Sequence, residues 1–176
     1  MATDPRYPVG KFDPPKGALT PAQRTQMIDT VAAQPAKLRA AVAGFSAAQL
    51  DTPYRDGGWT VRQVVHHLPD SHMNAYVRMK LALTEDDPTV KAYDEAKWAA
   101  LPDAHTMAPE VSLTLLDVLH QRWTTMLRAM TPEQFARKYK HPEYGHVTMD
   151  WVLAQYTWHG RHHTAQITTL REQKGW

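Results

Sequence analysis

The sequence TMDWVLAQYTWHGRHHTAQITTLRE, residues 148–172, combines a helical pattern of apolar side chains with three histidines. On a helix at about 100° per residue, its apolar side chains gather on one stripe, which must face a core. The members of this stripe are Met149, Val152, Leu153, Tyr156, Ile167 and Leu170. His159 and His163 also fall within it, four residues apart, so their rings project from adjacent turns. His162 points away from the stripe and is predicted to face solvent.

Two imidazoles buried side by side need partners for their ring nitrogens, and they would repel each other if both were charged. A divalent cation meets this need by accepting a lone pair from each neutral ring. The alternative is a pair of core histidines bonded to neighbouring polar groups. The chain has no cysteine, so the ligands of any metal must be nitrogen or oxygen. The residues between the two histidines, Gly160, Arg161 and His162, exclude the protease motif H-E-x-x-H.

A third ligand is expected from residues 60–84, which carry His66, His67 and His72. On the helical wheel His66 points away from the core, His67 lies at the edge of the apolar stripe, and His72 lies near its middle. Spacing alone leaves His67 and His72 open and favours His72 slightly. Pro69 removes a backbone hydrogen bond, and a bend there would swing His67 inward. The other histidines, at positions 105, 120, 141 and 146, are interpreted as surface or loop residues, with His141 and His146 as candidates to border a pocket.

Four capping boxes predict where helices begin, because in each a Ser or Thr precedes a Gln by three residues. They start at Thr20, Ser46, Thr60 and Thr131. Trp59 and Val64 flank the third box with the spacing of a hydrophobic staple. The long helices are expected at residues 20–44, 60–84, 110–129 and 148–172, and shorter ones at 46–50, 94–100 and 131–137.

These segments predict an all-α protein, a four-helix bundle in one domain spanning residues 1–176. The long stretch 85–109 favours a crossover connection. Residues 138–147 are expected to form a small hairpin before the last helix. Residues 1–18, rich in Pro and Gly, are expected to lie as an extended strap over the bundle.

Composition narrows the classes of function. The 176 residues carry 20 Lys and Arg against 18 Asp and Glu, without a basic run, which argues against nucleic-acid and membrane partners. The N-terminus lacks the apolar core of a signal peptide, and no stretch is long enough to span a membrane. We therefore expect a soluble, cytoplasmic protein.

Three motifs together resemble the YfiT-type branch of the DinB superfamily: YRDGGWTVRQVVHHLPDSH at 54–72, WHGRHH at 158–163 and YPVG at 7–10. The resemblance covers nearly the whole chain. It implies a four-helix bundle in which His67, His159 and His163 hold one metal ion, and it thereby selects His67 over His72. Two departures are Pro69, where relatives have a small helix former, and Gly160-Arg161, which bears on substrate preference.

The resemblance also implies an activity. Three neutral histidines leave a divalent ion, zinc or nickel first and iron or manganese as alternatives, with an open position for a thiolate or water. Members of the branch are labelled metal-dependent hydrolases, whereas the favoured activity is transfer of a small thiol such as bacillithiol to an electrophile. Hydrolysis at the same site and a non-catalytic module with a structural metal are the alternatives. A homodimer is expected.

Four polar residues and four tryptophans remain open at this point. Arg55 and Asp56 either contact the thiol or shape the turn at Gly57 and Gly58. Asp70 is interpreted as a solvated helix residue rather than as a partner of a ligand ring, and Arg161 as a substrate contact or a surface ion pair. Four tryptophans are expected in the core or at a dimer interface: Trp98, Trp123, Trp151 and Trp158.

Overall fold

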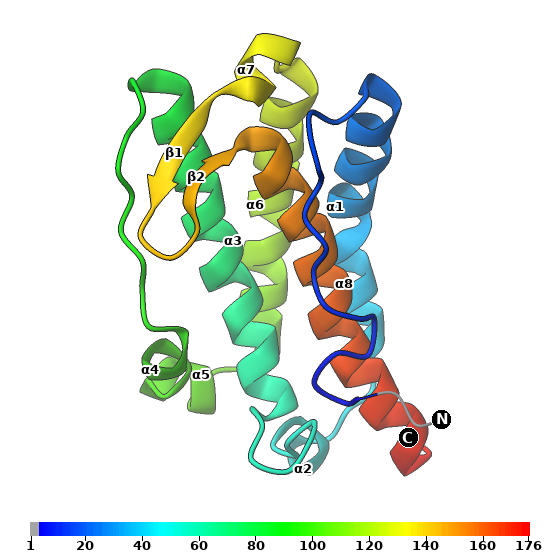
Figure 1. The fold of residues 1–176 in the computed structure, drawn as a ribbon. Helices are drawn as coiled ribbons and strands as arrows, with labels where there is room; N and C mark the ends of the chain where they lie inside the picture. Colours follow the sequence, from blue (N-terminus) through cyan, green and yellow to red (C-terminus); the bar gives the residue numbers. More distant parts are fainter. Residues whose placement is uncertain (1–3) are drawn as a thin grey trace.

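The computed structural model describes residues 4–176 and confirms the predicted four-helix bundle (Figure 1). Its long helices are α1 (Pro21–Val42), α3 (Val61–Thr84), α6 (Pro109–Ala129) and α8 (Met149–Lys174). The short helices are α2 (Ala47–Leu50), α4 (Glu95–Ala99), α5 (Pro102–Thr106) and α7 (Pro132–Ala136). A hairpin of β1 (Lys138–His141) and β2 (Gly145–Thr148) precedes α8, as expected. Only α5 among these elements was not predicted from the sequence.

The four predicted capping boxes are present, with Thr20, Ser46, Thr60 and Thr131 as N-caps. Each hydroxyl accepts a hydrogen bond from the backbone N–H of the Gln three residues on, and each Gln side chain bonds back to the cap. The local sequence thus marks the starts of α1, α2, α3 and α7, because a capping box closes within one helical turn.

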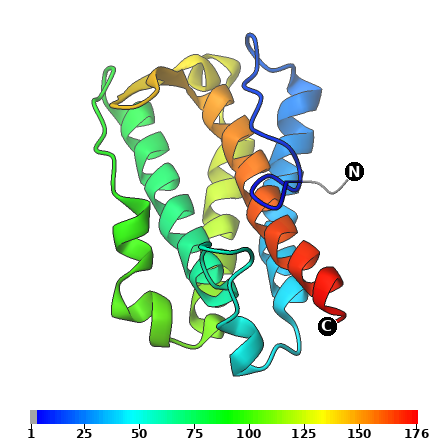
Figure 2. The same ribbon diagram turned by 60° about the horizontal axis from the view of Figure 1, so that its bottom comes forward.

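Two pairs of neighbouring helices, α1 with α8 and α3 with α6, run parallel, whereas neighbours in an up-and-down bundle are antiparallel. Polar contacts join Gln34 of α1 to Gly160 of α8 and, further along both helices, Arg171 of α8 to Ala41. Helices α3 and α6 also run in the same direction, because the chain returns along the outside of the bundle through α4 and α5 (Figures 1 and 2). The predicted crossover over residues 85–109 is therefore confirmed. Between α3 and α8 the contact is less extensive than between the other neighbouring helices.

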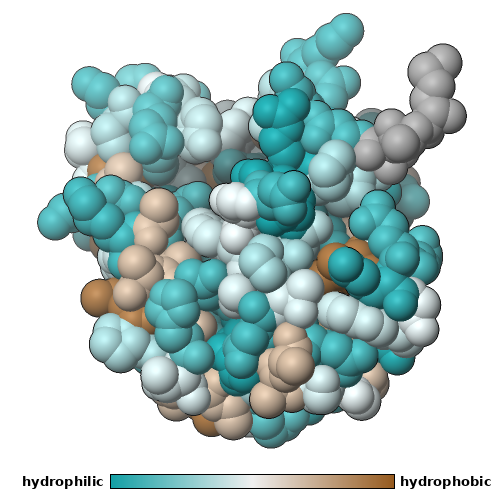
Figure 3. All heavy atoms as spheres, turned by 90° about the horizontal axis from the view of Figure 1, so that it is seen from below, coloured by the Kyte–Doolittle hydropathy of each residue, from teal (hydrophilic) through white to brown (hydrophobic). Residues whose placement is uncertain are grey.

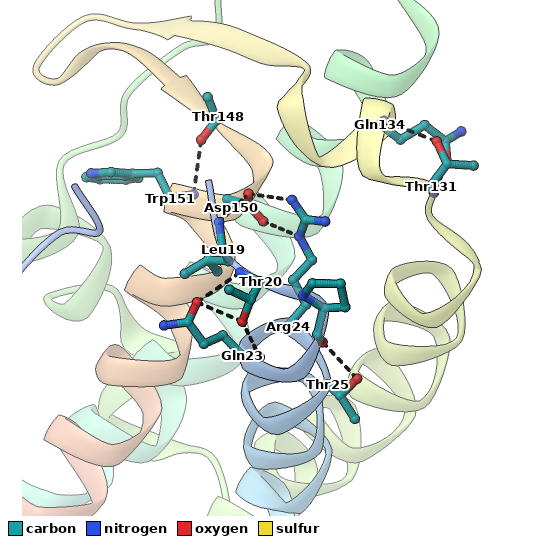
Figure 4. Close-up of polar contacts among 11 residues, drawn as sticks. Leu19, Thr20, Gln23, Arg24, Thr25, Thr131, Gln134, Thr148, Asp150 and Trp151 are labelled. Atoms are coloured by element: carbon teal, nitrogen blue, oxygen red, sulfur yellow. Dashed lines mark hydrogen bonds and ion pairs between the residues drawn. The ribbon is translucent and has the colours of Figure 1, made fainter. Parts of the chain in front are cut away.

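The strap was predicted over residues 1–18, of which residues 1–3 lie outside the described part of the chain. Residues 4–18 run along α8 without regular secondary structure (Figure 1). The indole Nε1 of Trp158 donates to the Gly10 carbonyl at 3.0 Å. Where the strap ends, Asp150 accepts from the Leu19 backbone N–H at 3.0 Å and takes two bonds of 2.7 Å from Arg24 (Figure 4). Asp150 is 2% exposed. The Arg24–Asp150 ion pair and the Leu19 bond therefore join α1, α8 and the end of the strap at a buried site.

The core contains two clusters of apolar side chains, one around Trp123 and one around Leu68. Trp123 is fully buried as expected, and Trp59 and Val64 share a cluster as the staple requires. Pro69 lies inside an α3 that continues unbroken through residue 84. Seen from the end that carries α2, mostly hydrophilic and neutral side chains cover the described part of the chain, with apolar ones scattered among them (Figure 3). None of the helices in residues 4–176 has the length and apolarity needed to cross a bilayer.

Candidate metal centre

The structure brings His67, His159 and His163 together where α3 faces α8. One ring nitrogen from each lies within 4.8 Å of the others. The Nε2 atoms of His67 and His159 are 3.3 Å apart, and the ring centroids of His159 and His163 are 4.5 Å apart. Among residues 4–176 no other group of three or more His, Asp or Glu side chains has this spacing. We call these three residues the triad.

The choice between His67 and His72 is decided by how α3 is turned toward its neighbours. His67, at the edge of the apolar stripe, faces α8 and the other two triad rings. His72 is 0% exposed and lies deeper, between α6 and α8, so it is outside the triad. Although spacing slightly favours His72, the group of three closely spaced rings contains His67. His72 lies in the middle of the stripe, toward the bundle axis, where it contacts His120 and His159.

The surroundings of the triad keep its three imidazole rings neutral, so that each has a nitrogen lone pair. His67 and His163 are buried, and His159 is partly exposed. Burial lowers the pKa of His67 to about 4. Burial and the neighbouring imidazoles hold the pKa values of His159 and His163 well below the usual 6.5. All three rings are consequently neutral at physiological pH, which is the state that binds a metal.

Neighbours orient two of the triad rings. The Nδ1–H of His163 donates to the Gln166 side-chain oxygen at 2.8 Å, which leaves the Nε2 lone pair free. His159 contacts the Nε2 of His72 through its Nδ1 at 3.1 Å. The Nδ1 of His72 contacts the Nε2 of His120 at 2.7 Å, and His120 in turn bonds the Val31 carbonyl at 2.7 Å.

His120, predicted as a surface or loop residue, is 1% exposed, so that prediction was wrong. A signal for its burial exists in the sequence, because His120 lies four residues after Leu116 and three before Trp123, both fully buried. The apolar stripe of α6 therefore includes His120 in the same way that the stripe of α8 includes the triad histidines.

Two more histidines, His162 and His66, are buried against expectation. His162 is covered by the strap and by Trp158, whose ring stacks on it at 4.4 Å. His66 bonds the Ser112 hydroxyl at the start of α6 and the Met107 carbonyl at the end of the crossover. His141 lies in the hairpin and, although buried, lines a cavity, as the sequence allowed. A helical wheel treats only the bundle core, whereas the strap, crossover and hairpin add a second covering layer. His105 and His146 are exposed as predicted.

One cavity borders the triad, and a second has no triad residue in its wall. The first, of about 370 Å³, includes His163 in its wall together with Arg6, Arg55 and Trp59. The second, of about 630 Å³, is lined by polar and aromatic side chains from α3, the crossover, the hairpin and α8. Its wall includes Tyr156, whose ring centroid lies 5.4 Å from that of His159.

The remaining open residues take different places. Asp70 is partly buried rather than solvated, and its burial raises the pKa of the carboxyl to about 6. Arg161 is exposed, and within residues 4–176 it forms no ion pair. Gly160 packs against Gln34 of α1, so this departure from the relatives concerns helix packing rather than a cavity wall.

Comparison with known proteins agrees with this geometry. The family model described as DinB superfamily matches residues 30–167. The chain is 48% identical to "Putative metal-dependent hydrolase YfiT" of Bacillus subtilis, covering 97% of this chain and 96% of that protein. It is 46% identical to "Putative metal-dependent hydrolase OB0782" of Oceanobacillus iheyensis, covering 97% and 98%.

Solved structures show the same relationship. The structure of YfiT from Bacillus subtilis, described as having an unusual four-helix bundle topology, superposes with a TM-score of 0.96 at 47% identity over 99% of both chains. The four-helix bundle protein TT2238 superposes with a TM-score of 0.57 at 19% identity, over 87% of this chain and 99% of that one, and shows the fold alone. Sequence, fold and the three converging histidines together lead to one conclusion: the chain belongs to the DinB superfamily.

Proposed function

We propose that this chain is a metal-dependent enzyme that transfers a low-molecular-weight thiol of the bacillithiol type to electrophilic substrates. The observation that carries the proposal is the triad: three neutral imidazoles converge, and no fourth His, Asp or Glu of residues 4–176 joins their group. A divalent cation held there would keep its full charge and a free position, as in catalytic rather than structural sites. The names of the relatives, metal-dependent hydrolases, support an enzyme.

The triad fits zinc or nickel first, with iron or manganese as alternatives, because imidazole binds all four. When bound, such an ion would lower the pKa of a thiol at its free position and supply a nucleophile near neutral pH. The chain itself has no cysteine, so the reacting sulfur would come from the cosubstrate. We expect the protein to act in the cytoplasm, where small thiols are kept reduced.

The cavity that His163 lines supports a binding site for the thiol. Arg6 and Arg55 both line the cavity beside His163. Arg6 is paired with Asp4, whereas Arg55 bonds only neutral oxygens and suits a carboxylate of the thiol. In the transfer, the thiolate sulfur forms a bond to the electrophilic carbon, and the leaving group departs with the electron pair of the bond that breaks.

Hydrolysis is the alternative for the same triad, with water in place of the thiol, and the names of the relatives favour it. A third possibility is a structural metal without catalysis. The chelation experiment described below separates that case from the other two, because a structural metal would be needed for folding.

A conjugation assay tests the proposal. Protein purified without a histidine tag is loaded with zinc or nickel and incubated with bacillithiol, cysteine or coenzyme A and an aryl halide or epoxide. We expect metal-dependent conjugate formation, detected by mass spectrometry, with the carboxylate-rich thiol preferred. His163→Ala should abolish both metal occupancy and conjugation, whereas the exposed His146→Ala should change neither. Hydrolysis of ester or amide substrates without any thiol conjugation would instead establish the alternative.

A further inference from the structure

A hydrogen-bonded chain of three imidazoles runs from the triad through the bundle core to helix α1. It begins at the Nδ1 of His159 on α8, passes through His72 on α3 and His120 on α6, and ends at the Val31 carbonyl on α1. The successive distances are 3.1, 2.7 and 2.7 Å. Each of the four long helices thus contributes one member.

The Val31 carbonyl, the last member, fixes which nitrogen donates and which accepts along this chain of imidazoles. A carbonyl oxygen can only accept, so the His120 Nδ1 must carry the proton that bonds Val31. In a neutral ring the His120 Nε2 is then an acceptor, and the His72 Nδ1 must donate to it. By the same step the His72 Nε2 accepts from the His159 Nδ1–H. The Nε2 of His159, 3.3 Å from the Nε2 of His67, is left with its lone pair free.

A proline makes the terminal carbonyl available. In an α-helix the Val31 carbonyl would accept from the backbone N–H of residue 35, but residue 35 is a buried proline and has no N–H. The oxygen therefore lacks its helical partner, and His120 supplies the missing donor at 2.7 Å. Aromatic neighbours also hold the middle ring in place: His72 lies parallel to His120 within 13° and edge-on to both Trp123 and Tyr156.

We propose that His72 and His120 are positioning residues that lock His159 in the tautomer with its Nε2 lone pair directed at the metal. This inference rests on metal binding by the triad, as in the proposed function, but not on the reaction catalysed. The chain is not suited to carry protons away from the site, because it ends at a backbone carbonyl. It acts instead through geometry, as outer partners of metal-binding histidines do in general.

Two variants of His120 test the lock. In His120→Leu the donor and the acceptor are both lost, whereas His120→Gln retains an N–H for Val31 and an oxygen for His72. We expect His120→Leu to weaken zinc binding, measured by competition with a chelator, by about 10- to 100-fold. The glutamine variant should stay within about threefold of wild type, since the polarity of the chain is preserved.

His66→Leu is the matched control, because His66 is also buried on α3 and bonded to α6 but lies outside the chain. It should bind zinc as tightly as wild type, with helical circular dichroism confirming that each variant is folded. Equal zinc affinity in His120→Leu and wild type, or an equal loss in His66→Leu, would overturn the proposal.

A measurement on the unaltered protein keeps the test decisive if a variant does not fold. Long-range ¹H–¹⁵N correlation spectra of the metal-free protein report which nitrogen of His159 carries the proton. We expect Nδ1, and a proton on Nε2 would refute the lock directly. If the wild-type protein bound no metal at all, the proposed function would fail, while this spectrum would still decide the tautomer.

Discussion

Acidification of the metal-free protein should destabilise it strongly, because several histidines are held neutral inside the bundle. Burial lowers the pKa values of His67, His120 and His162 to about 4, against about 6.5 in the unfolded chain. Between these two values the unfolded chain binds protons that the folded chain does not. Stability is therefore greatest above about pH 6.5 and is lost as the pH falls toward 4.

The size of the loss follows from the two pKa values. At pH 5 each of these three histidines lowers the free energy of unfolding by about 2 kcal/mol relative to pH 7.5. Together they remove about 6 kcal/mol, which is comparable to the whole stability of many domains. His72 and the rest of the triad act in the same direction. Asp70, whose pKa burial raises to about 6, offsets part of the loss.

Urea denaturation followed by circular dichroism at pH 7.5, 6.5, 5.5 and 5.0 measures this dependence. Replacing one of the buried histidines, as in His120→Gln, should reduce the loss at pH 5 by about 2 kcal/mol. The exposed His105→Gln serves as the control and should leave the curve unchanged. Excess zinc should restore stability at pH 5.5, because metal-bound rings do not take up protons. A free energy of unfolding that stays constant within about 1 kcal/mol from pH 7.5 to 5 would refute this reasoning.

Three further predictions concern packing, metal removal and assembly. In Gly160→Ala the added methyl carbon would lie 2.7 Å from the Gln34 side chain. We expect the free energy of unfolding, measured by urea denaturation, to fall by about 1–3 kcal/mol. An unchanged free energy of unfolding would contradict the close packing of α1 and α8. Chelation at pH 7.5 should abolish activity while helical circular dichroism persists, since both core clusters are apolar; unfolding would instead indicate a structural metal. Helices α3 and α6 expose large apolar side chains, among them Leu115 and Val118 of α6, and we expect a homodimer that buries them. The double variant Leu115→Glu, Val118→Glu should then be a monomer in light scattering. A monomeric wild-type protein would rule out this assembly.

Local features were predictable from the sequence alone. The Thr and Ser caps with their glutamines mark the starts of four helices, because a capping box closes within one turn and needs no distant partner. The pairing of His159 with His163 is equally local, since residues four apart on any helix project side by side. The bundle and two members of the triad could therefore be predicted from helical periodicity.

Tertiary structure decided the rest. Whether His67 or His72 completes the triad depends on how α3 is turned toward α8, and a wheel drawn for one helix does not contain that angle. The burial of His162 depends on the strap, more than 140 residues away in sequence. The link from Pro35 through the freed Val31 carbonyl to a metal-site tautomer needs all four helices in place. Periodicity and capping act within a few residues, whereas ring orientation and solvent exclusion arise only when distant segments pack together.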